Sequence, residues 1–245
     1  MVRLSVNVNK VATLRNARGG REPDMIEAVD ACLRAGAPGI TVHPRADQRH
    51  ITPTDVQRIS ERLAGLRDRV EYNIEGDPRP DLIDLVCTVK PHQCTLVPVM
   101  PGEITSQAGW PPGEMREQLV PVIKRLHDHG VRVSLFVEPD TQAIDWAAQL
   151  GADRVELYTE PFARAFEQGE GPGQASYQAY VQAAKQAHKH GLGVNAGHDL
   201  DLANLELFAQ LPHLDEVSIG HALMSRALFF GIEAVVREYL DKLHA

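Results

Sequence analysis

Eight short apolar segments, each followed by a helix-like segment, constrain the fold of this chain more than any other feature. They are rich in Val, Ile and Leu without clean alternation, as expected for parallel strands covered by helices. The predicted strands are Leu4–Val8, Gly39–His43, Val70–Ile74, Gln93–Pro98, Arg132–Val137, Arg154–Tyr158, Leu192–Ala196 and Glu216–Gly220. Amphipathic helices are predicted between them, for example over Asp24–Ala35, Thr54–Leu66, Met115–His129, Thr141–Leu150, Ser176–His190 and Leu202–Gln210.

This repeat predicts an α/β fold, a TIM (β/α)8 barrel that forms a single domain over residues 1–245. The length of 245 residues is close to the ~250 that such barrels typically need. An open, doubly wound sheet is the alternative, although no GxGxxG motif follows the first strand. Two long, glycine-containing segments, 99–114 and 162–175, are predicted to be loops at the carboxyl end of the barrel.

Composition excludes several classes of function. A net charge of −8 argues against nucleic-acid binding as the main role. No window has the ~18 consecutive apolar residues of a membrane span, and the chain enters a strand pattern directly, without a signal peptide. The cysteines, Cys32, Cys87 and Cys94, have no CxxC spacing and are expected to be reduced thiols. We therefore expect a cytoplasmic protein.

Polar residues at the strand ends predict a functional site at the carboxyl end of the barrel, where TIM-barrel active sites lie. Histidines follow three strands, at His43, His198 and His221. Gly197 and Gly220 precede two of them and allow backbone N–H groups to hold a phosphate, whereas the neighbouring Asp199 is expected to cap the next helix. The other predicted members of the cluster are Asn7, Asn9, Arg45, His50, Glu71, Glu75 and Glu156.

Carboxylates within apolar strands are a second signal, because a buried charge is costly unless it is paired. Partial desolvation raises the pKa of a carboxyl group and suits it to general base catalysis. Glu71 is the predicted base, with Glu75 on the same strand face as its rival. The alternative is a structural pairing with arginine, which Arg132 and Arg154 make more credible for Glu156 than for Glu71.

Metal and Schiff-base chemistry are less favoured by the sequence. The histidines are dispersed among strands without an HxH or HExxH motif, so an acid–base role ranks above a metal site. Among the lysines only Lys10 follows a strand at the predicted catalytic end, and an enzyme-bound imine would depend on it. Its position beside arginines suits phosphate or hydroxyl binding better.

The chain resembles the pyridoxine 5′-phosphate synthase family of vitamin B6 biosynthesis in segments that span its whole length. The matching segments are Val6–Gly19, Gly39–Arg45, Arg49–Ile51, Val133–Phe136, Val194–His198 and Ile219–Ala222. The resemblance implies a TIM barrel with additional helices, assembled into a homo-oligomer, an octamer. It also implies ring closure between 1-deoxy-D-xylulose 5-phosphate and 3-amino-2-oxopropyl phosphate to give pyridoxine 5′-phosphate, phosphate and water. No metal or organic cofactor is implied, because the substrates form an imine with each other.

Residue roles follow from the resemblance by position. It implies that His43 and Glu71 accept protons, that His198 donates a proton as phosphate leaves, and that Glu156 stabilises the transition state. Contacts to the two phosphorylated substrates are implied for Asn7, Asn9, Lys10, Arg18, Arg45, His50, Thr105, Asp199, Gly220 and His221. Thr105 lies in the long segment after the fourth strand, which fits a closing lid.

The chain departs from many family members at Asn9-Lys10, where those members have Asp-His, and Asp199 replaces a glycine of some members.

Two other functions stay open at this point. A phosphosugar isomerase or epimerase on the same barrel would need a base and one phosphate site but no amine substrate. A non-catalytic ligand sensor or scaffold would need neither His43 nor His198.

Overall fold

A closed barrel of eight parallel strands, β1 to β8 in chain order, forms the centre of the computed structural model, which describes residues 1–99, 107–113 and 115–244. The strands are β1 Arg3–Asn7, β2 Gly39–Val42, β3 Glu71–Gly76, β4 Gln93–Leu96, β5 Arg132–Val137, β6 Arg154–Tyr158, β7 Gly193–Gly197 and β8 Leu214–Ile219. β8 pairs with β1 to close the ring. The predicted TIM barrel is confirmed, and the open sheet is wrong.

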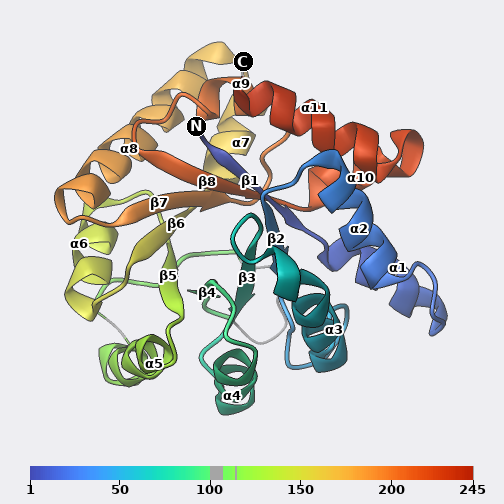
Figure 1. Cartoon of the computed structure of the whole chain (residues 1–245). Helices are drawn as coiled ribbons and strands as arrows, with labels where there is room; N and C mark the ends of the chain where they lie inside the picture. Colours follow the sequence, from blue (N-terminus) through green and yellow to red (C-terminus); the bar gives the residue numbers. More distant parts are fainter. Residues whose placement is uncertain (100–106, 114, 245) are drawn as a thin grey trace.

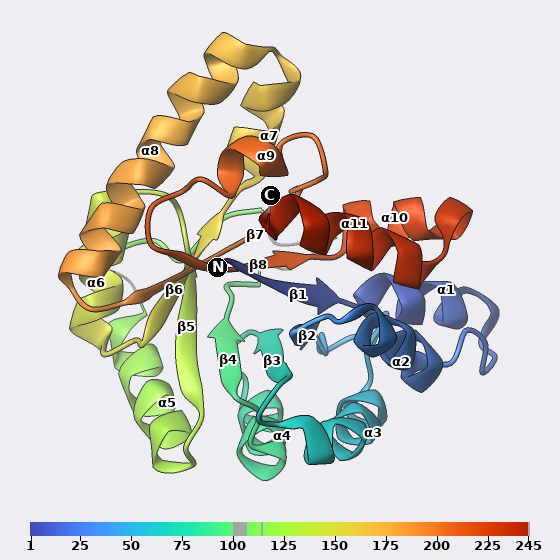
Figure 2. The same cartoon turned by 45° about the horizontal axis from the view of Figure 1, so that its top comes forward.

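Helices surround this ring of strands, as Figure 1 shows. They are α1 Asn9–Arg18, α2 Met25–Ala35, α3 Pro53–Leu63, α4 Pro80–Val89, α5 Arg116–Asp128, α6 Thr141–Leu150, α7 Glu160–Glu167, α8 Glu170–Lys189, α9 Leu205–Phe208, α10 His221–Phe230 and α11 Ile232–His244, with a 3₁₀ turn at Ala64–Leu66. Asp24 caps α2, and Thr52 with Asp55 forms a capping box at α3. Figure 2 shows α1, α2, α10 and α11 grouped on one side of the barrel.

Side chains alternate along the strands between an apolar outer face and a polar interior. Leu4 and Val6, for example, belong to the apolar core between strands and helices. Ser5 instead hydrogen-bonds Thr41, and Arg132 of β5 reaches Glu71 of β3, a strand that is not its neighbour. Contacts between non-adjacent strands can form only inside the barrel. The prediction of strands without clean alternation is therefore wrong, and the interior is polar rather than filled by branched apolar residues.

The segment 162–175 is mostly helical, and its prediction as a loop is wrong. Pro161 lies in the first turn of α7, where its missing N–H is no loss, and Phe162 packs against Phe208 at 5.0 Å between ring centroids. Gly173 lies in α8 against Phe166, so that a β-carbon there would be 3.1 Å from the Phe166 ring. Close packing between α7 and α8 explains this glycine better than a flexible loop does.

No helix among the described residues is both long and apolar enough to span a membrane.

Candidate active site

The carboxyl end of β2 and the carboxyl end of β3 bring a histidine and a carboxylate together. His43 follows β2, and its Nδ1 lies 3.9 Å from Oε2 of Glu75, the penultimate residue of β3. Both side chains are buried. The Nε2 atom of His43 is also buried and has no hydrogen-bond partner among the described residues. His43 and Glu75 thus form a buried acid–base pair, and Nε2 of His43 is available to interact with a further group.

Glu71 lies at the opposite end of the same strand, so its predicted place in the cluster at the carboxyl end of the barrel is wrong. It opens β3, and its carboxylate pairs with Arg132 and, at 3.1 Å, with Nη1 of Arg3. Four residues of a strand span about 13 Å, which separates Glu71 from the catalytic end of the barrel. The structural pairing with arginine therefore applies to Glu71, and Glu75 takes its place as the candidate base.

Glu156 lies halfway along β6 inside the barrel. The alternative of a structural pairing with arginine finds no support, because no ion pair among the described residues includes Glu156. Burial raises its pKa to about 7, although a hydrogen bond with Thr95 lowers it. A β-carbon at Gly197 would lie 2.4 Å from Oε1 of Glu156. The glycine before His198 therefore makes room for this carboxyl group beside the end of β7.

Glu216, near the start of β8, is a further interior carboxyl group that the sequence analysis missed. Burial and the charge of Glu71 raise its pKa to about 8, against the lowering effect of Arg3 and Arg154. Burial, followed by the charge of Glu156, also raises the pKa of Glu75 well above its ordinary value. Protonated forms of Glu156 and Glu216 therefore persist near neutral pH.

The pKa of Glu156 predicts how stability depends on pH. The folded-state value of about 7 exceeds the ordinary 4.5, so the stability contributed by this group is complete below pH 4.5 and is lost as pH rises through 7. We expect Glu156→Gln to raise the free energy of unfolding at pH 8 by about 3 kcal/mol and to change it little at pH 4.5. Urea unfolding at both pH values measures this, with exposed Glu167→Gln as the control. Equal effects at both pH values would contradict it.

The segment after β2 adds positive charge around His43. Arg45 is buried, and the His50 ring lies 6.2 Å from the His43 ring. Burial, then the charges of Arg45, His50, Arg79 and His198, lowers the pKa of His43 well below its ordinary value. Burial together with Arg45 and Lys10 lowers the pKa of His50 to about 4. His43 is therefore neutral at pH 7 and can accept a proton, in surroundings that attract an anion.

Asn7 and Asn9 connect β1 and α1 to this histidine. The side-chain oxygen of Asn7 accepts from the Asn9 N–H at 3.0 Å, and that of Asn9 accepts from the His43 N–H at 2.9 Å. Asn9 thus positions the backbone of His43, a task that an amide oxygen and a carboxylate can both perform. A β-carbon at Gly220 would be 3.0 Å from Cβ of Asn7, so the end of β8 approaches β1 closely because residue 220 is a glycine.

His198 closes the opposite side of the site. It follows β7 with a φ of 84°, and its ring lies 4.9 Å from Phe136 and 5.4 Å from Tyr158. Burial lowers its pKa, while the charge of Asp199 raises it. The expected helix cap by Asp199 is wrong, because Asp201 accepts from the N–H groups of Ala203 and Asn204 instead.

The remaining predicted binding residues lie at the edge of the site or away from it. Lys10 and His221, at the starts of α1 and α10, line a mainly apolar groove of about 360 Å³ between these helices. Arg18 is the exposed last residue of α1, roughly 13 Å along the helix axis from Asn9. The structure does not bring Arg18 to the carboxyl end of its own barrel. Thr105 lies outside the described residues.

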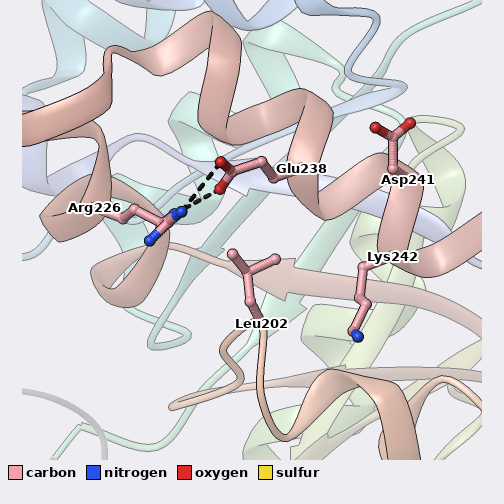
Figure 3. A pocket seen from close by; sticks show the side chains of 5 residues that line it. All are labelled: Leu202, Arg226, Glu238, Asp241 and Lys242. Carbon is pink, nitrogen blue, oxygen red and sulfur yellow. Dashed lines mark hydrogen bonds and ion pairs between the residues drawn. The ribbon is translucent and has the colours of Figure 1, made fainter.

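A second hollow, of about 450 Å³, lies on the outer surface between α10, α11 and Leu202 (Figure 3). Arg226 forms two hydrogen bonds with Glu238, at 2.5 and 3.1 Å, and Lys242 pairs with Glu206 at 2.5 Å. Its cations are already paired, and its lining residues belong to α10, α11 and the loop after β7 rather than to the strands. Across the described ranges, no three His, Cys, Asp or Glu side chains gather to hold a metal ion.

Comparison with known proteins gives consistent matches. The family model for "Pyridoxal phosphate biosynthesis protein PdxJ" matches residues 4–245. Proteins named pyridoxine 5′-phosphate synthase are 49% identical over 244 residues in Porphyromonas gingivalis (99% of each chain) and 51% identical over 244 residues in Bacteroides fragilis (99% of this chain and 100% of the relative).

Solved structures match in fold alone. A phosphoribosyl anthranilate isomerase from Thermotoga maritima has a TM-score of 0.61 at 13% identity and covers 100% of this chain, with 99% of its own chain matched. The YdjI aldolase from Escherichia coli K12 has a TM-score of 0.61 at 13% identity, with 99% of this chain and 89% of that chain covered.

Proposed function

Because the chain belongs to the family of the pyridoxal phosphate biosynthesis protein PdxJ, we propose that it is a pyridoxine 5′-phosphate synthase. It condenses 1-deoxy-D-xylulose 5-phosphate with 3-amino-2-oxopropyl phosphate and releases pyridoxine 5′-phosphate, phosphate and water. The observation that carries this assignment is the match over nearly the whole chain to synthases at 49–51% identity. The buried His43–Glu75 pair supports it, because ring closure through an imine needs repeated proton transfers.

His43 and Glu75 act as the proton acceptors of the reaction. His43 is neutral at pH 7, and its Nε2 is available for a substrate proton. Burial raises the pKa of Glu75, which makes its carboxylate a stronger base toward a substrate proton. Glu75 therefore replaces Glu71 in this role.

His198 donates a proton to the leaving phosphate, and Glu156 stabilises positive charge that develops on the substrate nitrogen. His198 is half-buried against aromatic rings, where an arriving phosphate dianion raises the pKa of its imidazole and favours the protonated donor. Glu156 reaches the site through the space that Gly197 leaves free. A nearby cation favours the ionised form of this buried carboxyl group, and the resulting carboxylate interacts strongly with the cation in such dry surroundings.

Substrate phosphates bind to the cations and backbone N–H groups around this pair. Arg45, His50 and Lys10 are the proposed contacts to the deoxyxylulose phosphate, together with Thr105, which lies outside the described residues. Gly220 and His221 present the first N–H groups of α10 to a phosphate. Asn7 contacts the amino-ketone phosphate, and Asp199, in the loop after β7, takes the phosphate-side role that the resemblance implies. Arg18 is the other proposed contact to the amino-ketone phosphate. Because Arg18 does not lie at the carboxyl end of its own barrel, this contact requires its side chain to come close to the carboxyl end of a barrel.

Omission of one substrate separates a synthase from an isomerase or epimerase. We expect no change in 1-deoxy-D-xylulose 5-phosphate when the protein is incubated with it alone, because ring closure requires the amine. Proton NMR in deuterated buffer follows both loss of the substrate and exchange at its carbons. Conversion of the single sugar phosphate into an isomer would support the isomerase and overturn the synthase.

We propose that the protein assembles into a homo-oligomer, an octamer, through the apolar surface of α1 and α10. Leu14, Leu228, Phe229 and Phe230 are exposed there, with Phe229 82% exposed. Apolar side chains that gather on a surface commonly mark an interface. The same side of the barrel carries the groove beside Lys10 and His221.

The buried thiols Cys32, Cys87 and Cys94 suit a cytoplasmic location.

Phe229→Asp tests the role of this surface. We expect the variant to form smaller particles than the wild type at the same concentration, because a charge in an apolar interface is costly to desolvate. Light scattering coupled to size-exclusion chromatography measures the mass. Val120→Asp, on the exposed face of α5, is the control. An unchanged mass for Phe229→Asp, or an equal loss in the control, would contradict the assignment.

A further inference from the structure

Arg79, in the turn between β3 and α4, joins two loops at the carboxyl end of the barrel. Its Nη2 donates to the carbonyl oxygen of Pro44, its Nη1 pairs with Asp77, and its Nε donates to Oδ2 of Asp81 at 3.1 Å. The side chain is only 16% exposed. A planar guanidinium that meets three acceptors in fixed directions restrains all of them at once.

The restrained groups flank the candidate acid–base pair. Pro44 directly follows His43, and Asp77 lies two residues after Glu75. The 3.9 Å between His43 Nδ1 and Glu75 Oε2 is longer than a hydrogen bond. Proton transfer tolerates only small changes in this distance. A movement of either loop by about 1 Å can therefore cost about 100-fold in rate.

We propose that Arg79 is a positioning residue, which holds the segments after β2 and β3 together and thereby sets the geometry of the His43–Glu75 pair. This proposal rests on the proposed function, in which His43 and Glu75 are the proton acceptors. The observations that support it are the hydrogen bonds from one side chain to both loops and the burial of that side chain.

The charge of Arg79 adds a second, measurable effect. The groups that face His43 are Glu75 from β3, Arg45 and His50 from the segment after β2, Arg79 itself, and His198 from the loop after β7. Each of the arginines disfavours a further positive charge on the imidazole. Loss of the Arg79 charge should therefore raise the pKa of His43, whereas loss of a restraint alone should leave it unchanged.

Arg79→Gln, Arg79→Lys and Asp77→Asn test the proposal. We expect Arg79→Gln to lower kcat about 10- to 100-fold with KM nearly unchanged, and to move the acidic limb of the kcat profile to higher pH. Arg79→Lys keeps the charge and loses the planar geometry, so kcat should fall while the limb stays near that of the wild type. Asp77→Asn should lower kcat without removing the Arg79 charge.

Arg125→Gln is the matched control, because Arg125 also pairs with a carboxylate of α4, Asp84 at 2.7 Å, but on the exposed surface. We expect wild-type kinetics for it. NMR titration of the His43 ring in wild type and Arg79→Gln reads the charge effect without any turnover. If the wild type lacks synthase activity but the titration shifts, the proposed function fails and the electrostatic contact stands.

Two results would overturn the positioning role. One is wild-type kcat in Arg79→Gln. The other is a loss of kcat with an unshifted His43 titration and no loss in Asp77→Asn, which would mark a general packing defect. Circular dichroism checks the fold of each variant, and if Arg79→Gln does not fold, Arg79→Lys and Asp77→Asn decide the question.

Discussion

Glu75→Gln should lower kcat by about 100- to 10,000-fold while changing the KM of either substrate little. The substitution keeps the size of a side chain that lies 3.9 Å from His43 but removes its ability to take up a proton. Loss of a positioned general base typically costs this much, and the loss falls on the transition state rather than on substrate binding. Steady-state kinetics with each substrate varied in turn provides the measurement.

Glu71→Gln is the contrasting variant on the same strand. Glu71 faces Arg132 and Arg3 at the amino end of β3, so we expect kcat within about tenfold of the wild type once the protein is folded. The assignment of the base to Glu75 would be wrong if Glu71→Gln lost activity as severely as Glu75→Gln at full retention of structure.

Arg132→Met should destabilise the fold by about 3 kcal/mol. Glu71 is 6% exposed, and when Arg132 is lost its remaining ion pair among the described residues is with Arg3. Removal of one partner from a buried ion pair leaves a charge without its full compensation. For a protein of this size, the melting temperature should fall by roughly 6–12 °C. Thermal and urea unfolding measure both quantities.

The controls for Arg132→Met use a surface pair and a double variant. Arg125→Met breaks an exposed pair with Asp84 and should cost less than about 1 kcal/mol. Combining Glu71→Gln with Arg132→Met removes both charges and should recover part of the lost stability. A loss for Arg132→Met no larger than that for Arg125→Met would show that the interior pair does not support the barrel.

The order of strands and helices was predictable because strand segments and helix ends carry strong local signals. Gly36 and Gly151, for example, have the positive φ values expected of glycines that end helices. The prediction failed where local signals conflict with packing. The glycines of 162–175 indicated a loop, but Phe162, Phe166 and Phe208 pack the segment into helices.

The candidate site was predictable in composition but not in every position. His43 and His198 could be placed at the carboxyl end because each directly follows a strand. Glu71 and Glu75 share one strand face, but the predicted strand Val70–Ile74 has Glu71 near its start and Glu75 just after its end, so the same rule favoured Glu75. The polar alternation inside the strands, as in Glu71, Asn73 and Glu75, was present in the sequence and would have indicated the carboxyl-lined interior.

The role of Arg79 and the partners of Glu216 could not be recognised from sequence, because both depend on contacts distant along the chain. Arg79 contacts Pro44, and Glu216 lies with Arg3 and Glu71 only once β8 closes against β1. Local periodicity carries no information about such contacts. Barrel closure decides which charges meet.

Turnover of both phosphorylated substrates by the purified wild-type protein tests the central claim most directly. Pyridoxine 5′-phosphate is followed by its absorbance and released phosphate by a coupled assay, with each substrate omitted in turn. We predict equal amounts of both products, formed only when both substrates are present and abolished in Glu75→Gln. Folded wild-type protein that releases neither product would contradict the account.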